Sequence, residues 1–67
     1  MKLIKHVANG RPDIKFWAQR NPGKVESYSV IYQADGFPAT EDEDDWFADF
    51  SVADAIAKDH AARYNER

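Results

Sequence analysis

Two segments of alternating polarity, 13–20 and 25–33, are joined by the four residues Asn21-Pro22-Gly23-Lys24. Apolar residues at every second position are typical of a β-strand with one buried face. Proline and glycine at the two central positions of the connection are typical of a type II turn. The sequence therefore predicts an antiparallel strand pair. The residues expected on its larger apolar face are Ile14, Phe16 and Ala18 from the first strand and Tyr28, Val30 and Tyr32 from the second.

A further strand is predicted before this pair, over residues 2–7. Asn9-Gly10 follows it and is typical of a hairpin with a type I′ turn, in which both central residues take positive φ. Pro12 comes next, at a position where it can open a strand but cannot lie inside a central one. We therefore expect a β-hairpin at the N-terminal end of the chain.

The C-terminal part of the chain has helical periodicity. Ser51 is a favourable N-cap, and the helix is expected to continue from there to about Asn65. The apolar stripe of this helix recurs at helical spacing. It consists of Ala53, Ile56, Ala57, His60, Ala61 and Tyr64. Before the helix, residues 46–50 are interpreted as a fourth strand, a first helical turn being the alternative. In this strand Trp46, Ala48 and Phe50 are expected to face inward and Phe47 and Asp49 outward.

The expected fold is α+β: an antiparallel three- to four-stranded sheet with one C-terminal helix packed on a face. With 67 residues the chain has room for one domain, 1–67. It has no cysteine, which excludes disulfides and thiolate zinc sites and fits a reducing cytoplasm. No apolar run is long enough for a membrane helix or a signal peptide. The start at Met1 favours a complete small protein.

Charge is divided unevenly along the chain. Residues 1–24 carry six Lys or Arg against one Asp, whereas residues 25–57 carry nine Asp or Glu and no Lys or Arg. Such asymmetry concerns partners and solubility rather than fold. Two interpretations stay open. Either the basic and acidic parts neutralise each other inside the folded domain, or the acidic part attracts a basic partner.

The densest charge is an acidic-aromatic segment, defined here as residues 41–49. Five consecutive carboxylates run directly into aromatic residues. Closely spaced carboxylates resemble the phosphates of a nucleic-acid backbone, and exposed aromatics can anchor an interface. We therefore expect a partner-binding site here, with a solvated loop as the alternative. Its predicted residues are Glu41, Asp42, Glu43, Asp44, Asp45, Trp46, Phe47 and Asp49, and Tyr28 is a further candidate anchor.

Catalytic, metal and cofactor sites are not predicted. The chain has two histidines, His6 and His60, and His60 is expected at the edge of the core. No serine has the context of an activated nucleophile, and the isolated glycines form no phosphate-binding loop. The acidic run lacks the glycine and the distal glutamate of a calcium-binding loop, so that only incidental cation binding is expected.

A basic hairpin offers an alternative function. It combines cations with an aromatic ring, the mixture used to bind nucleic acid, and its residues are Lys15, Trp17, Arg20 and Lys24. The acidic run would repel phosphate over about 10 Å, which disfavours this function. Trp17 packing under the helix or against a second subunit is the competing interpretation. A structural or regulatory homodimer is a third alternative.

Two patterns resemble families that bacteriophages encode against their hosts. Lys15-Phe16-Trp17-Ala18, then Val30-Ile31-Tyr32, then an alanine-rich helix from Val52, is similar to phage inhibitors of bacterial RNA polymerase. The opening Met1-Lys2-Leu3-Ile4-Lys5, with strands, an acidic segment and a charged C-terminal helix, is similar to small anti-CRISPR proteins. The resemblance implies a cytoplasmic, non-enzymatic phage inhibitor that acts as a DNA mimic. Its partner would be a host protein or ribonucleoprotein with a basic groove.

Overall fold

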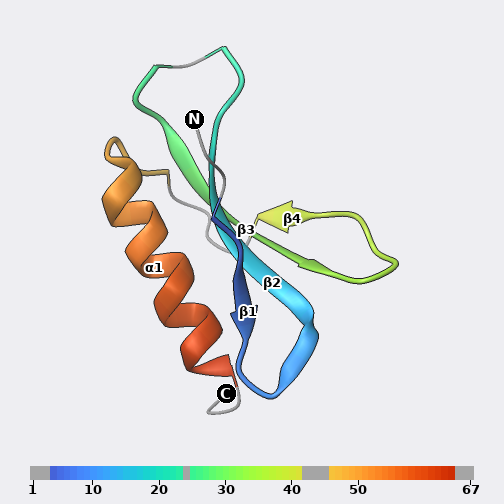
Figure 1. Cartoon of the computed structure of the whole chain (residues 1–67). Helices are drawn as coiled ribbons and strands as arrows, with labels where there is room; N and C mark the ends of the chain where they lie inside the picture. The colour runs from blue at the N-terminus through green and yellow to red at the C-terminus, as the bar shows by residue number, and fades with distance from the viewer. Residues whose placement is uncertain (1–3, 24, 42–45, 65–67) are drawn as a thin grey trace.

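The computed structural model of the chain describes residues 4–23, 25–41 and 46–64. Within these ranges its elements are β1 (His6–Ala8), β2 (Arg11–Arg20), β3 (Tyr28–Ala34), β4 (Thr40–Glu41) and α1 (Phe50–Ala62). The strands form one antiparallel sheet in the order β1-β2-β3-β4. The helix lies along one face of this sheet (Figure 1). The predicted α+β architecture is confirmed.

The central strand pair has the predicted alternation. Phe16 lies opposite Tyr32 and Ala18 lies opposite Val30. These residues face the helix, and the side chains of Phe16 and Val30 are completely buried. Their burial explains why this register is fixed, since a shift by one residue would turn the apolar face toward water.

The helix packs mainly on β2 through a stripe of small residues. Ala53, Ala57 and Ala61 are each at most 2% exposed. Side chains this small let the helix axis approach the sheet closely, so that large rings from the strands fill the remaining space. Phe16 takes this role: its ring centroid lies 5.6 Å from that of Tyr32 and 6.2 Å from that of His60.

The N-terminal hairpin exists, but it differs from the prediction in two respects. The strand covers His6–Ala8 rather than 2–7; Ile4 and Lys5 precede it, and residues 2–3 lie outside the described residues. Gly10 has a φ of 78°, whereas Asn9 has no positive φ, so the turn is not type I′. The Asn9 amide instead donates to the Ala61 carbonyl at 2.8 Å, near the C-terminal end of α1. The hairpin therefore also satisfies part of the helix end.

The connection between β2 and β3 is longer than predicted. The strand starts at Tyr28, not at Val25, whose side chain is 84% exposed in the turn. Gly23 has a φ of 74°, as the predicted type II turn requires. Glu26 also has a left-handed φ, of 58°, and this conformation is incompatible with an extended strand, so β3 begins only after Glu26. The Asn21 amide donates to the Ser27 carbonyl and closes this loop.

The predicted fourth strand over residues 46–50 is wrong. The fourth strand is Thr40–Glu41, Phe47 makes an isolated bridge to Tyr28, and α1 already begins at Phe50. The N-cap is Asp49 rather than Ser51, and residue 65 lies outside the described residues. The physical reason is that the Asp49 carboxylate accepts hydrogen bonds from both the amide and the hydroxyl of Ser51, so the helix starts one residue after Asp49.

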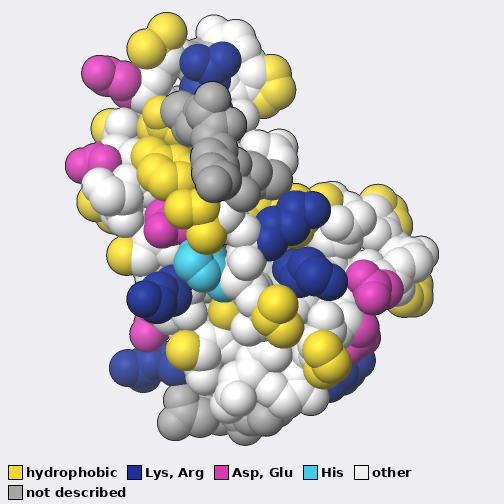
Figure 2. Space-filling view, in the orientation of Figure 1, with side chains coloured by type: hydrophobic (Ala, Val, Ile, Leu, Met, Phe, Trp, Pro, Cys, Tyr) yellow, Lys and Arg dark blue, Asp and Glu magenta, His cyan; other side chains and the backbone are white. Residues whose placement is uncertain are grey.

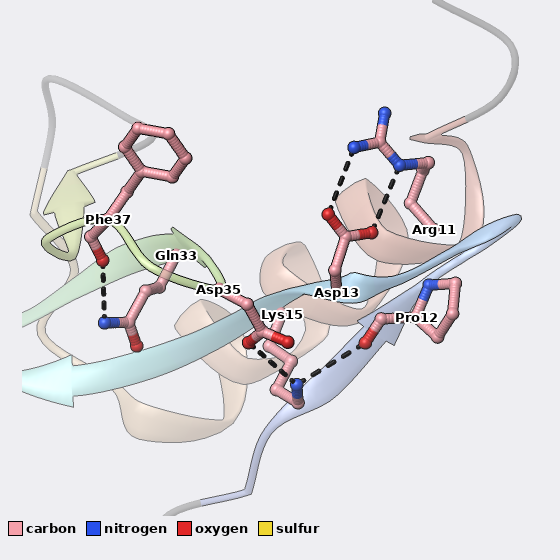
Figure 3. Close-up of polar contacts among 7 residues, drawn as sticks. All are labelled: Arg11, Pro12, Asp13, Lys15, Gln33, Asp35 and Phe37. Atoms are coloured by element: carbon pink, nitrogen blue, oxygen red, sulfur yellow. Dashed lines mark hydrogen bonds and ion pairs between the residues drawn. The ribbon is translucent and has the colours of Figure 1, made fainter.

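Polar contacts fasten the end of the sheet where β2 begins and β3 ends (Figure 3). Arg11 and Asp13 form a two-point ion pair, with both N–O distances at 3.1 Å. The Lys15 ammonium lies 3.7 Å from the Asp35 carboxylate. In the turn toward β4, the Gln33 amide donates to the Phe37 carbonyl, and Figure 3 shows the Phe37 ring pointing away from this contact.

Candidate partner-binding site

The two ends of the acidic run are attached to the same strand. Glu41 pairs with Ile31 of β3, and Phe47 pairs with Tyr28 of the same strand. Five residues, 42–46, therefore connect attachment points that only two residues of β3, 29–30, separate. An uninterrupted antiparallel ladder would need equal numbers on both sides. The two described attachment points, Glu41 and Phe47, therefore do not belong to one uninterrupted ladder; residues 42–45 lie outside the described residues.

Trp46 and Phe47 each face the side opposite to the one predicted. The Trp46 side chain is 61% exposed, although it was expected to face inward. Phe47, expected to face outward, is half-buried and packs against both core clusters. The two backbone hydrogen bonds between Phe47 and Tyr28 fix this orientation, because neighbouring residues of an extended segment point to opposite sides. Trp46 is thus available to a partner, whereas Phe47 anchors the segment to the core.

Tyr28 is also unavailable as an interface anchor. Its side chain is buried, and its ring lies 5.6 Å from that of Phe50 in an edge-to-face contact. The half-buried Phe50 therefore packs against the same core cluster as Tyr28. Of the three aromatics predicted as anchors, Trp46 alone exposes more than half of its side chain to solvent.

Asp49 combines a structural contact with an exposed charge. Its carboxylate accepts from the Ser51 hydroxyl at 2.7 Å and from the Ser51 amide at 3.0 Å. These hydrogen bonds stabilise the ionised form and lower the pKa of Asp49 below its usual value. The carboxylate therefore stays negative at neutral pH and stabilises the positive end of the helix dipole.

The basic hairpin does not present its aromatic ring. Trp17 lies on the sheet face away from α1 and is only 4% exposed. The Lys5 ammonium lies 4.8 Å above its ring centre, and its indole N–H donates to the side-chain oxygen of Gln19. Arg20 is exposed, and Lys24 lies outside the described residues. In this arrangement no nucleic-acid base can stack on Trp17.

The uneven charge of the sequence is kept in space, because the sheet order follows the chain order. The Lys and Arg side chains near the centre of Figure 2 lie over the sheet. Within the described ranges, Lys15 is the one Lys or Arg of residues 1–24 that contacts a carboxylate of residues 25–57. Glu41, by contrast, is exposed and forms no ion pair with any described Lys or Arg. Among the described residues, ion pairing between the Lys and Arg of the basic part and the carboxylates of the acidic part is therefore confined to the contact between Lys15 and Asp35.

The two histidines lie between the helix and the sheet. His6 Nε2 is 2.8 Å from Asp54 Oδ1, a contact that joins β1 to α1. His60 is half-buried at the core edge, as predicted, with its ring edge-on to Phe16. Among the described residues, no three His, Asp or Glu side chains gather closely enough to hold a metal ion.

Sequence reasoning missed two features that shape the site. Asp49 was placed only among the partner-binding acids, although aspartate is as good an N-cap as serine. Val52 and Ala55 were missed because they fall outside the buried helical stripe; Val52 is 47% exposed and lies three residues after the acidic-aromatic segment in the sequence. Apolar residues outside the core-facing stripe were the available signal for this second feature.

Comparisons with protein families, with curated proteins and with solved structures found no match to this chain. Across the described residues, no helix has both the length and the apolar character needed to cross a membrane.

Proposed function

We propose that this chain is a non-enzymatic cytoplasmic protein that binds and inhibits a nucleic-acid-handling complex of a host cell. The acidic-aromatic segment would occupy a basic groove that normally holds phosphates. Glu41, Asp42, Glu43, Asp44 and Asp45 supply the charge, Trp46 supplies the apolar anchor, and Phe47 positions the segment from below. This assigns an anti-CRISPR-like mode of action, by chemistry rather than by relationship.

One observation carries the proposal. Five consecutive carboxylates, residues 41–45, directly precede in sequence a Trp whose side chain is 61% exposed, and the flanking Glu41 and Phe47 are both paired to β3. A folded chain gains nothing from adjacent like charges, and no described Lys or Arg contacts Glu41. A basic partner would supply the missing counter-charge and would associate rapidly through electrostatic steering.

The test is capture from host lysate with tagged protein, elution in steps of rising salt, and identification by mass spectrometry. We expect a nucleic-acid-handling complex that elutes at moderate salt. Replacing Asp42, Asp44 and Asp45 with Asn should abolish capture and leave the circular dichroism spectrum unchanged. A matched control carries Glu26→Gln, Asp35→Asn and Asp59→Asn, which change the net charge equally but lie elsewhere in the sequence.

The control separates a local site from a general effect of charge. Capture should survive in the control variant and should be inhibited by nucleic acid that the captured complex itself binds. Equal capture by the wild type and by the acidic-to-amide variant would refute the proposal.

The basic-hairpin alternative is testable by an oligonucleotide mobility shift. The buried ring of Trp17 and the ion pair of Lys15 with Asp35 count against it. We expect no shift at physiological salt. A shift that Arg20→Gln weakens would favour nucleic-acid binding over the proposed function.

A further inference from the structure

The turn between β1 and β2 consists of the dipeptide Asn9-Gly10. An asparagine that precedes a glycine is prone to spontaneous deamidation. The next backbone nitrogen can attack the side-chain amide carbon, and glycine has no Cβ to obstruct this approach. Both residues of the turn are exposed. The fold therefore presents a chemically reactive pair to water.

The two reacting groups are not held by hydrogen bonds. Within the described residues, the side chain of Asn9 has no hydrogen-bond partner and the Gly10 amide donates to no acceptor. The backbone amide of Asn9 is the group in use, and it donates to the Ala61 carbonyl. The pairing next to the turn is irregular, since its register shifts between Val7 and Ala8. Local opening at such a hairpin end requires less free energy than global unfolding, and it would let the nitrogen reach the side chain.

A second asparagine in the chain provides the contrast. Asn21 precedes Pro22, whose nitrogen carries no hydrogen and cannot act as the nucleophile. The side-chain amide of Asn21 donates to the Ser27 hydroxyl at 2.8 Å, and its oxygen accepts from the Ser29 hydroxyl at 2.9 Å. Asn21 is therefore protected by its neighbour in the sequence and by its contacts, whereas Asn9 has neither protection.

We propose that Asn9 is a site of spontaneous deamidation, and that the isoaspartate formed there loosens the β1–β2 turn from the C-terminal end of α1. The Gly10 nitrogen loses its proton and forms a bond to Cγ of Asn9. The bond from Cγ to Nδ2 breaks, and ammonia leaves with a proton in exchange. Water then opens the succinimide. Cleavage between the nitrogen and Cγ gives aspartate, whereas cleavage between the nitrogen and the backbone carbonyl carbon gives isoaspartate.

Isoaspartate changes the turn in two ways. Its main chain runs through Cβ and Cγ, so the turn between the paired residues Ala8 and Arg11 gains one carbon atom. It also places a carboxylate next to the amide that bonds to Ala61, near the negative end of the helix dipole. Arg11 already pairs with Asp13 and is not free to neutralise it. Both changes weaken the hydrogen bond to Ala61, so the stability of the protein should decline with age. This inference does not depend on the proposed function.

The test is incubation of the full chain at physiological temperature and neutral pH, in native buffer and in urea. Tryptic peptides are mapped by mass spectrometry, and isoaspartate is detected with an isoaspartyl methyltransferase. We expect the peptide with Asn9 to gain one mass unit and to accept methyl groups in native buffer, while the peptide with Asn21 does neither. Asn9→Gln is the matched variant. It keeps a side-chain amide but closes a larger ring more slowly, so it should show neither change.

The effect on the turn is measured on the isoaspartate form after its chromatographic separation. Amide hydrogen exchange by NMR reports the bond between the residue 9 amide and Ala61. We expect its protection to fall by about tenfold, the effect of losing one hydrogen bond, and the melting temperature to fall with it.

Two results would overturn the deamidation site. Reaction of Asn9 in urea but not in native buffer would show that the fold protects the turn, and an equal mass gain at Asn21 would show that neither the glycine nor the free side chain directs the reaction. Unchanged exchange protection and melting temperature in the isoaspartate form would overturn the proposed loosening from α1.

Discussion

Tyr28 and Phe47 exchange two backbone hydrogen bonds, each with an N–O distance of 2.8 Å. This pair joins the first residue of β3 to the segment that leads into the helix. It orients Phe47 toward the core and Trp46 toward solvent, and it attaches the segment before the helix to β3. A single bridge therefore decides which aromatic side chain can meet a partner.

We predict opposite effects for the two neighbouring aromatics. Phe47→Ala removes a half-buried ring from both core clusters and should lower the free energy of unfolding by about 2 kcal/mol. Trp46→Ala removes an exposed ring and should change stability by less than about 0.5 kcal/mol. Urea denaturation measures both. The hypothesis that Phe47 anchors the segment fails if Trp46→Ala is the more destabilising change.

The two tryptophans should differ in their access to solvent. In the variant Trp46→Phe, the fluorescence comes from the buried Trp17 and should be blue-shifted and poorly quenched by acrylamide. In Trp17→Phe, emission from Trp46 should be readily quenched. Caesium should then quench more strongly than iodide, because nearby carboxylates attract cations. Efficient iodide quenching of Trp17 would show that its ring is open to anionic ligands, as the basic-hairpin alternative requires.

Asp49 should make stability dependent on pH in the acidic range. Because its pKa is lowered in the folded state, its contribution is present above the unfolded pKa of about 3.9 and is lost as the pH falls through the folded value. Asn is an equally good N-cap that does not titrate. We therefore expect the melting temperature of Asp49→Asn to fall less steeply than that of the wild type as the pH is lowered in the acidic range.

Asp49→Ala serves as the second variant for this measurement, since it removes the cap at every pH. It should lower the melting temperature near neutrality, where Asp49→Asn should not. Identical acid limbs for the wild type and Asp49→Asn would assign the acid sensitivity to other carboxylates, such as Asp13, whose pKa the hydrogen bond from Arg11 lowers.

The contact between His6 and Asp54 should couple β1 to the helix. Each side chain is about one-fifth to one-quarter exposed, at 18% and 25%. A double-mutant cycle with His6→Ala and Asp54→Ala should give a coupling free energy of about 0.5–1.5 kcal/mol, typical of a single hydrogen bond. Additive effects of the two substitutions would show that the contact does not hold the hairpin to α1.

The sequence by itself determined the central strand pair, the C-terminal helix and the α+β class. These depend on local periodicity: residues 14, 16 and 18 alternate, and Ala53, Ala57 and Ala61 recur once per helical turn. Each pattern repeats over several residues, so one misplaced residue does not change the result. The uneven distribution of charge was likewise readable from the sequence alone.

Only the tertiary structure decided the positions of the aromatic side chains. Trp17 has the same strand context whether it is exposed or buried, and the Lys5 ammonium above its ring comes from a different segment. Trp46 and Phe47 are adjacent, and their directions follow from the bridge to Tyr28, which is 19 residues away from Phe47 in the chain. Contacts between distant residues carry no local periodicity, and for this reason the sequence predicted the acidic-aromatic segment but assigned its two aromatics to the wrong sides.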